Sequence, residues 1–263
     1  MRVASQSNLS RLDVALVRAG LARSRQQAQH LIAAGQVMVD AQSAVKSSQL
    51  VGAEAELVVD AQSWVSRAGN KLVGALDDAS LAVPARCLDV GASTGGFTQV
   101  LLQRGAKRVY AVDVGHGQLA GELAGDARVV PRDGLNAKDL TLADVEDEPV
   151  GLVVVDVSFI SLLAVLPSVL PLVAADGSAL VLVKPQFEVG RAALGRSGIV
   201  RDEAARRRAV DKVCAQAQSL GWTPVWQGVS RLPGAHGNIE YFAHLRPWDG
   251  APSLSGGPDK LLG

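Results

Sequence analysis

The sequence predicts an α/β protein in which a mostly parallel sheet of seven strands follows a small N-terminal α+β unit. From residue 71 onward, apolar strand-like runs alternate with helical patterns, as they do in parallel sheets. Residues 152–155, Leu-Val-Val-Val, are apolar throughout, which is typical of a strand buried on both faces. The chain also has 27 glycines among 263 residues, which suits a fold with many tight turns.

The first unit is expected to span residues 9–60. Apolar positions at helical spacing between Ser10 and Gly20 predict one helix. A second helix is expected to run from Ser24, its N-cap, to Gly35. Short strands are predicted at residues 37–39 and 57–59.

The second unit is expected to span residues 71–248, after a polar linker at residues 61–70. Its clearest helix lies between Asp202 and Leu220, with Gly221 as the stop signal. The tail, residues 249–263, is rich in glycine, proline and serine and is expected to lack fixed structure. The predicted strands are Arg86–Val90, Arg108–Val112, Arg128–Val130, Gly151–Val155, Ser178–Val183, Pro224–Val229 and Asn238–Leu245.

Composition excludes several classes of protein. Twenty-six basic and 26 acidic residues give zero net charge, which argues against a wholly basic nucleic-acid coat but permits a local basic patch. A hydrophobic content of 48% with 20% charge excludes a disordered chain. The N-terminus has no apolar leader and no apolar run reaches membrane-spanning length, so a cytoplasmic protein is expected. Cys87 and Cys214 are expected to be buried, reduced thiols, and four scattered histidines suggest no metal site.

Basic charge is concentrated at the start of the chain. Residues 1–39 carry five arginines and one aspartate, whereas residues 40–60 carry one lysine against four acids. A basic helical pair is a candidate for binding phosphates, although a solvated helix face would show the same charge pattern. A second run, Arg206–Arg208, allows the same two interpretations. The candidate RNA-binding residues are Arg11, Arg18, Arg23, Arg25 and Arg67.

A glycine-rich turn follows the first predicted strand of the second unit. Residues 88–97, Leu-Asp-Val-Gly-Ala-Ser-Thr-Gly-Gly-Phe, lead from that strand into a helix. Glycines there allow a ligand to approach the backbone, and the helix N-terminus favours polar or anionic groups. Asp113, 22 residues after Gly91, ends the next strand, where a carboxylate can accept both hydroxyls of an adenosine ribose. The turn is not the dinucleotide pattern and is nearer to that of S-adenosylmethionine enzymes.

Polar residues also stand at the ends of later strands. Asp156 follows Gly151–Val155, and Lys184 follows Ser178–Val183. In open α/β sheets ligands bind at this edge, so a carboxylate and an ammonium at neighbouring strand ends suggest a site, although a structural ion pair is the alternative. Glu240 lies in the last predicted strand, where an inward-facing acid requires a partner, and Lys71 directly follows the linker.

These four residues resemble, in order and context, the Lys-Asp-Lys-Glu set of FtsJ-like ribose 2′-O-methyltransferases. Their contexts are Ser66–Leu72, Asp156–Leu162, Lys184–Glu188 and Gly237–Glu240. They are similar to those of the TlyA, or haemolysin A, family. Residues 11–39 resemble the small RNA-binding domain of ribosomal protein S-four, which that family fuses to its methyltransferase domain.

The resemblance implies a Rossmann-like class I fold and methyl transfer from S-adenosyl-L-methionine to a ribose, that of cytidine, in ribosomal RNA of the small subunit, the large subunit or both. Lys71, Asp156, Lys184 and Glu240 would be catalytic. Lys184 would contact the ribose hydroxyl, as a base or as a cation that stabilises the alkoxide. Asp156 would orient Lys184, and Glu240 would hold Lys71 or the ribose. Residues implied to bind the cofactor are Asp89, Gly91, Ser93, Gly95, Gly96, Phe97, Asp113 and Asn136.

The sequence departs from the family pattern in three places. Asp40-Ala41 replaces the usual Asn-Gly of a strand turn, Gln62 stands where some members have arginine, and residues 132–136 replace the commoner Glu-x-Thr-Asn but retain Asn136. Three alternatives remain: a non-catalytic RNA-binding or ribosome-assembly factor, a membrane-active haemolysin, and a methyltransferase for bases or proteins. The first would require a broken set of four residues, and the second a secretion signal and a membrane segment. The third would usually require different residues at the strand ends.

Overall fold

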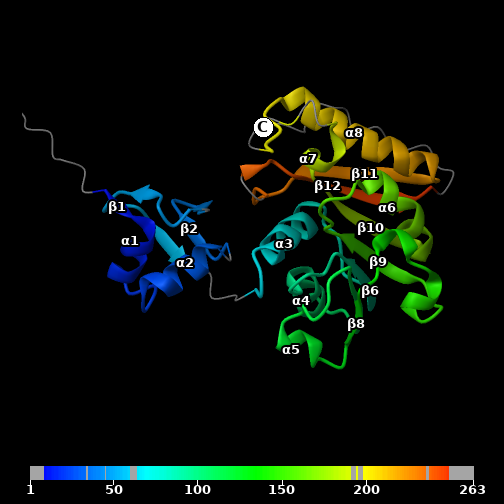
Figure 1. The fold of residues 1–263 in the computed structure, drawn as a ribbon, viewed down its shortest axis with the longest axis horizontal. Helices are drawn as coiled ribbons and strands as arrows, with labels where there is room; N and C mark the ends of the chain where they lie inside the picture. Colours follow the sequence, from blue (N-terminus) through cyan, green and yellow to red (C-terminus); the bar gives the residue numbers. More distant parts are fainter. Residues whose placement is uncertain are drawn as a thin grey trace, which may run out of the picture. The chain divides into compact units, whose positions relative to one another are not determined.

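In the computed structural model the chain divides into two compact units, residues 1–70 and 71–263. Each unit is described by itself (Figure 1). The structure describes residues 9–33, 35–44, 46–59, 64–190, 194, 198–234 and 237–248. The expected tail and the beginning of the expected linker, residues 61–63, lie outside the described residues.

The first unit has the two predicted helices and strands, together with three short strands that the sequence did not predict. Leu12, Leu16, Ala28 and Ile32 are buried in its core because they share the inner faces of the helices. The Ser24 side chain accepts a hydrogen bond from the Gln27 amide at 3.2 Å, which confirms it as the N-cap. The elements are β1 (Ser10–Arg11), α1 (Leu12–Arg18), α2 (Arg25–Ala33), β2 (Val37–Val39), β3 (Gln42–Ser43), β4 (Leu50–Val51) and β5 (Leu57–Val59).

The β2–β3 turn contains the first departure from the family pattern. Asp40 and Ala41 both adopt positive φ, 50° and 63°, a conformation that Asn-Gly adopts with less strain. The Asp40 carboxylate accepts the Glu56 amide at 2.9 Å, so this acid ties the turn to the residue preceding β5.

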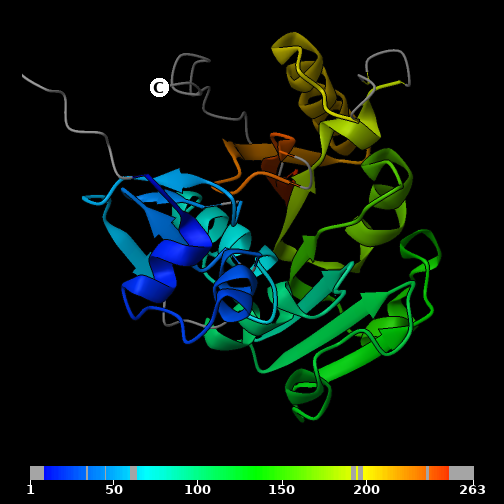
Figure 2. The same cartoon turned by 60° about the vertical axis from the view of Figure 1, so that its left-hand side comes forward.

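The second unit contains a seven-stranded sheet in the order β11-β12-β10-β9-β6-β7-β8. The five strands from β10 to β8 are parallel, and β12 pairs antiparallel with both β10 and β11. The antiparallel pair, coloured orange to red, lies at one end of the sheet in Figures 1 and 2. The strands are β6 (Arg86–Val90), β7 (Arg108–Asp113), β8 (Val129–Asp133), β9 (Val150–Val155), β10 (Val173–Val183), β11 (Trp222–Val229) and β12 (Tyr241–Pro247).

Helices cover both faces of this sheet. Helices α6 and α8 pack on one face, where alternate residues of β6 and β10 are fully buried against them. Helix α4 lies on the other face, where its Phe97 ring stacks on Phe242 of β12. The helices are α3 (Ala68–Asp78), α4 (Gly96–Gln103), α5 (Gly121–Ala124), α6 (Leu162–Val169), α7 (Pro185–Glu188) and α8 (Glu203–Ser219), with 3-10 turns at Ala137–Asp139, Leu142–Val145 and Leu170–Leu172.

Most strand predictions agree with the structure to within one or two residues, and the exceptions have physical causes. β10 begins at Val173, five residues before the expected Ser178, and its pairing with β9 shifts register between those residues. β8 continues through Pro131 because it is an edge strand, where a missing amide hydrogen is tolerated. Glu240 precedes β12 rather than lying within it, and residues 68–70 begin α3 rather than ending a linker.

Candidate active site

The carboxyl ends of β6 and β9 meet at the point where the strand order reverses, which is where open α/β sheets bind ligands. The Asp156 amide donates a hydrogen bond to the Val90 carbonyl at 2.9 Å. Gly91 adopts a φ of 88°, and a Cβ there would lie 2.4 Å from the Asp156 carbonyl oxygen. The glycine is therefore required by the close approach of the two strand ends as well as by its φ.

Asp113, at the end of β7, holds the glycine-rich turn in place. One carboxylate oxygen accepts the Ser93 amide at 2.8 Å, and the other accepts the Gly115 amide at 2.7 Å. A carboxylate has about four lone-pair sites, so acceptor capacity remains for further donors. The arrangement joins the loops after β6 and β7 around a single acid.

A cavity of about 440 Å³ opens at this edge, which is within the usual size range of small-molecule sites. Its lining combines polar groups from the ends of β6, β7 and β9 with apolar side chains from the loops. Five residues predicted for the site line it: Gly91, Ser93, Asp113, Asn136 and Asp156. The sequence reasoning missed other lining residues, including Val114, Gln118, Leu135, Phe159 and Ile160.

The other residues expected at the cofactor lie outside the cavity lining. Gly95 is the left-handed N-cap of α4, at a φ of 96°, and Gly96 is buried as the first residue of that helix. Phe97 is buried against Phe242. Asp89 is fully buried below the turn, where Thr98 donates a hydrogen bond to it at 2.7 Å. Desolvation by burial raises the Asp89 pKa to about 7, and the nearby charge of Asp156 adds to this.

Lys184 and Asp156 form a nearly buried ion pair at the ends of β10 and β9. Lys184 Nζ lies 2.6 Å from Asp156 Oδ1 and donates a hydrogen bond to Ser158 Oγ at 2.9 Å. The structure thus places Asp156 in contact with Lys184, and its role in orienting Lys184 stays a prediction. Ser158 belongs to the Asp156–Leu162 motif, but its contact with Lys184 depends on the fold of the loop after β9 and could not be predicted from the sequence.

Lys71 and Glu240 form a second ion pair, at 2.6 Å, with side chains only 7% and 2% exposed. Lys71 lies in α3, and Glu240 lies just before β12. Because Val183 pairs with Tyr241, the antiparallel register places Glu240 opposite Lys184. The fold therefore brings the two ion pairs to the same edge of the sheet.

Two aromatic rings flank the Asp156–Lys184 pair. Phe159, three residues after Asp156, is 93% exposed and has a φ of 64°. Its ring centroid lies 5.4 Å from that of Phe187, three residues after Lys184. The low aromatic content gave no reason to expect an exposed ring at the cavity.

The candidate RNA-binding arginines of the first unit are exposed, except that Arg67 is half-buried. Two of them share the fully buried carboxylate of Asp13, which accepts hydrogen bonds from Arg11 at 3.0 Å, Arg25 at 2.9 Å and Gln29 at 3.1 Å. The hydrogen bond from Arg11 is the main cause of a pKa for Asp13 well below its ordinary value. Arg11 and Arg25 are thus held close together with their outer faces in solvent.

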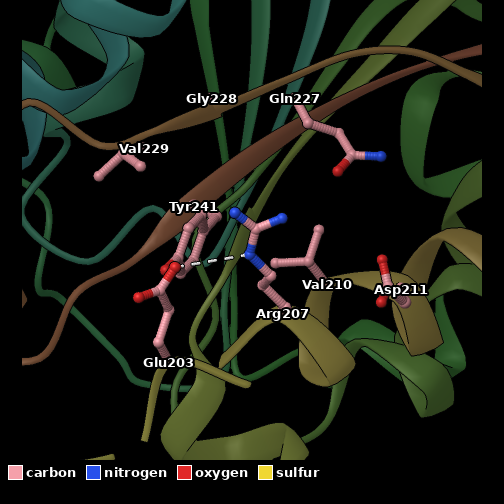
Figure 3. Close-up of a pocket in the computed structure, with 8 residues that line it drawn as sticks. All are labelled: Glu203, Arg207, Val210, Asp211, Gln227, Gly228, Val229 and Tyr241. Carbon is pink, nitrogen blue, oxygen red and sulfur yellow. Dashed lines mark ion pairs between the residues drawn. The ribbon is translucent and has the colours of Figure 1, made fainter. Parts of the chain in front are cut away.

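The second arginine run has mostly internal partners. Arg206 donates hydrogen bonds to the Tyr241 hydroxyl and to the carbonyls of Val200 and Arg201. Arg207 pairs with Glu203 at 3.6 Å one turn apart on α8, where both line a cavity of about 130 Å³ between α8 and the strands β11 and β12 (Figure 3). Arg208 pairs with Asp202. These contacts favour the solvated helix face over an RNA surface.

Cys87 and Cys214 are free and buried, as expected, and burial raises their pKa values to about 12 and 11. Within the described ranges, no helix is both long and apolar enough to cross a membrane. In the same residues, no three His, Cys, Asp or Glu side chains gather as potential metal ligands.

Two family models match the chain. Residues 64–247 match the FtsJ-like methyltransferase model, and residues 10–57 match the S4 domain model. The first match contains the glycine-rich turn and both ion pairs, and the second contains the Asp13 cluster.

The chain is also similar to curated proteins and solved structures. It is 51% identical to the 16S/23S rRNA (cytidine-2′-O)-methyltransferase TlyA of Mycobacterium tuberculosis, over 90% of each chain. It is 39% identical to Hemolysin A of Brachyspira hyodysenteriae, over 89% of this chain and 99% of that protein. A solved structure of a Streptococcus thermophilus protein, provisionally named a hemolysin, matches with a TM-score of 0.70 and 37% identity, over 93% of this chain and 90% of that one.

Proposed function

The chain belongs to the FtsJ-like methyltransferase family, and we propose that it methylates the 2′-hydroxyl of a ribose, that of a cytidine, in ribosomal RNA. The observation that carries this proposal is the placement of Lys184 Nζ against Asp156 and Ser158, two residues that line the cavity. Protonated lysine has three N–H donors. Ser158 Oγ accepts one of them and the Asp156 carboxylate lies within ion-pair distance, so a donor is left for an acceptor oxygen.

The cavity suits S-adenosyl-L-methionine as the methyl donor. The carboxylate of Asp113 provides acceptors for ribose hydroxyls, and Gly91 leaves the backbone open to close approach. When bound, this cofactor supplies an electrophilic methyl group on a sulfonium that is its own leaving group. The acidic side chain of Asp156, which also lines the cavity, complements a positive charge there.

The residues of the second unit then have two tasks, alignment and handling one proton. Alignment of two reactants can account for about 7–11 kcal/mol of a barrier. Lys184 holds the acceptor hydroxyl and either takes its proton or stabilises the developing alkoxide. Asp156 fixes the position of Lys184, and the Lys71–Glu240 pair forms the adjoining wall.

The first unit supplies affinity for the RNA through its exposed arginines. Arg11, Arg18, Arg23 and Arg25 are candidates for phosphate contacts, with Arg67 at the beginning of the second unit's family match. We infer that the substrate is RNA within ribosomal subunits in the cytoplasm. The tuberculosis relative is named for methylation of 16S and 23S rRNA, which supports ribosomal RNA as the substrate.

The decisive experiment measures tritium transfer from labelled S-adenosylmethionine to purified 30S and 50S subunits. Wild type is compared with Lys184→Ala and with Lys107→Ala, an exposed lysine just before β7, at the opposite edge of the sheet. Primer extension at low dNTP concentration locates the modified nucleotide. We expect label on a cytidine 2′-oxygen with wild type and Lys107→Ala, and none with Lys184→Ala.

Other results would refute parts of the proposal. Cofactor binding without label on either subunit would exclude ribosomal RNA as the substrate. Label on a base would exclude ribose chemistry. Undiminished transfer by Lys184→Ala would exclude the role given to that lysine, and failure to bind the cofactor would favour a non-catalytic RNA-binding protein.

A further inference from the structure

Glu188 is a buried carboxylate beside the site that the proposed mechanism does not use. It ends α7, four residues after Lys184, and is only 7% exposed. A buried carboxylate is costly unless its oxygens are hydrogen-bonded. Both are: Oε2 accepts the Ser161 hydroxyl at 2.5 Å, and Oε1 accepts the Leu162 amide at 2.8 Å.

These hydrogen bonds place Glu188 at the N-terminus of α6. Ser161 is the N-cap of that helix, and its Oγ also accepts the Leu163 amide at 3.2 Å. Free amides and the helix dipole at this end favour a negative charge. Glu188 is therefore satisfied by neutral donors, and it connects α7 to a helix that begins 26 residues earlier in the chain.

The two connected segments carry the residues assigned to the acceptor side of the site. Segment 156–161 holds Asp156, Ser158 and Phe159, and segment 184–188 holds Lys184 and Phe187. Contacts between the segments follow the same order along both. Lys184 contacts Asp156 and Ser158, then Phe187 meets Phe159, and finally Glu188 binds Ser161.

The first segment needs such an anchor. Phe159 has a φ of 64°, a left-handed conformation that is energetically costly for a bulky residue. Its ring is 93% exposed, so burial of the ring does not offset this cost. The Glu188 bonds fix the chain two and three residues beyond Phe159, and the Lys184 contacts fix it on the other side.

We propose that Glu188 is a positioning residue for methyl transfer. It fastens segment 156–161 to segment 184–188, so that Ser158 stays on Lys184 and Phe159 stays at the cavity rim. Glu188 does not line the cofactor cavity, so its effect falls on the acceptor side of the site. This inference rests on the proposed function for its kinetic consequence, but its structural consequence can be measured without a substrate.

The test compares Glu188→Ala and Glu188→Gln with Glu122→Ala, which removes an exposed glutamate of α5. Alanine removes both acceptors. Glutamine keeps one acceptor for the Leu162 amide, and its amide hydrogens can be donated to Ser161 Oγ. Three quantities are measured on the full chain: cofactor Kd by calorimetry, single-turnover methyl transfer to ribosomal subunits, and hydrogen exchange in residues 157–163.

We expect Glu188→Ala to slow methyl transfer by ~10-fold or more and to speed hydrogen exchange in residues 157–163, with cofactor Kd changed by less than ~3-fold. Glu188→Gln should recover most of the rate and of the protection, and Glu122→Ala should match wild type. Rescue by glutamine separates positioning by hydrogen bonds from a general loss of folding.

Two results would overturn the proposal. One is wild-type transfer and exchange in Glu188→Ala. The other is equal damage to cofactor binding, exchange and transfer in both Glu188 variants, which would make Glu188 a general structural residue. If wild type itself methylates no ribosomal RNA, the proposed function fails, and hydrogen exchange alone still decides whether Glu188 fastens the two segments.

Discussion

The carboxylate of Glu240 lies 2.6 Å from the ammonium of Lys71, although 169 residues separate them in the chain. Both side chains are buried, so the pair brings α3 to the residue preceding β12. A buried pair of this kind can serve folding, chemistry or both. Removal of one partner leaves the other charge buried and unpaired, whereas removal of both leaves no buried charge.

We expect Lys71→Met and Glu240→Met each to lower the free energy of unfolding by ~3–5 kcal/mol, because each leaves a buried charge unpaired. The double variant should recover most of this loss, since neither charge remains. If the pair also serves methyl transfer, the double variant should stay inactive. Urea unfolding and tritium transfer measure the two effects, and recovery of both together would make the pair purely structural.

Asp113 should control cofactor affinity rather than RNA affinity. Its carboxylate holds the Ser93 and Gly115 amides and lines the cavity. We expect Asp113→Ala to weaken S-adenosylmethionine binding by ~10-fold or more, because it removes the acceptors for the ribose and loosens both loops. Calorimetry with the cofactor and filter binding with subunits measure the two affinities. A weaker affinity for subunits with an unchanged cofactor Kd would contradict this assignment.

Asp13 gives the first unit a predictable response to acid. Its pKa in the folded protein lies below the value of about 3.9 expected in the unfolded chain. In the range of pH between these two values the folded state therefore binds fewer protons than the unfolded chain. The stabilisation of the fold by ionised Asp13 is fully present above the pKa of Asp13 in the unfolded chain, and it is lost as pH falls through the pKa of Asp13 in the folded protein. Wild type should have a higher unfolding temperature than Asp13→Asn. The interval between the two unfolding temperatures should be constant from pH 7 to pH 5 and should narrow below pH ~4.

Scanning calorimetry of the full chain, with hydrogen exchange to identify the transition of residues 9–59, measures this interval. Glu54→Gln, which neutralises an exposed acid of the same unit, is the matched control and should show no such interval. An interval for Asp13→Asn that widens below pH 4 would show that the arginines do not stabilise the Asp13 carboxylate.

Asp89 should act in the opposite direction. Its folded pKa of about 7 exceeds the unfolded value, so the folded state keeps a proton that the unfolded chain has released. Stability contributed by this group is therefore highest in acid and declines as pH rises from about 4 to 7. Asp89→Asn should raise the unfolding temperature at pH 8 by ~3 °C and have little effect at pH 4. A lower unfolding temperature for the variant at pH 8 would show that ionised Asp89 has a stabilising partner.

The sequence predicted the sheet and the strand ends well because both depend on local patterns. Apolar runs identified all seven strands of the second unit, and the residue after a buried strand lies at the sheet edge, as Asp156 and Lys184 do. The contexts of Lys71 and Glu240 came from family resemblance. The sequence left Lys71 and the ribose as alternative partners of Glu240, and the structure shows the contact with Lys71.

Other features could not be predicted because they depend on how the loops fold back. Phe97 was expected to contact the cofactor because it directly follows the glycines. In the structure, however, it lies in the first turn of α4, and its ring packs on Phe242. Glu188 belongs to the Lys184–Glu188 motif, yet its hydrogen-bond donors lie at the start of α6, about 26 residues earlier in the chain. Arg11 and Arg25 were counted as free positive charges, whereas Asp13 is buried between them.

The contact between Gly91 and Asp156 limits how this site can change. A Cβ at Gly91 would lie 2.4 Å from the Asp156 carbonyl oxygen, so the ends of β6 and β9 touch at this point of the cavity that both residues line. Any larger residue at this position must push the ends of β6 and β9 apart. A variant of Gly91 therefore displaces Asp156 together with the glycine-rich turn, and engineering of this site has to begin elsewhere along the rim.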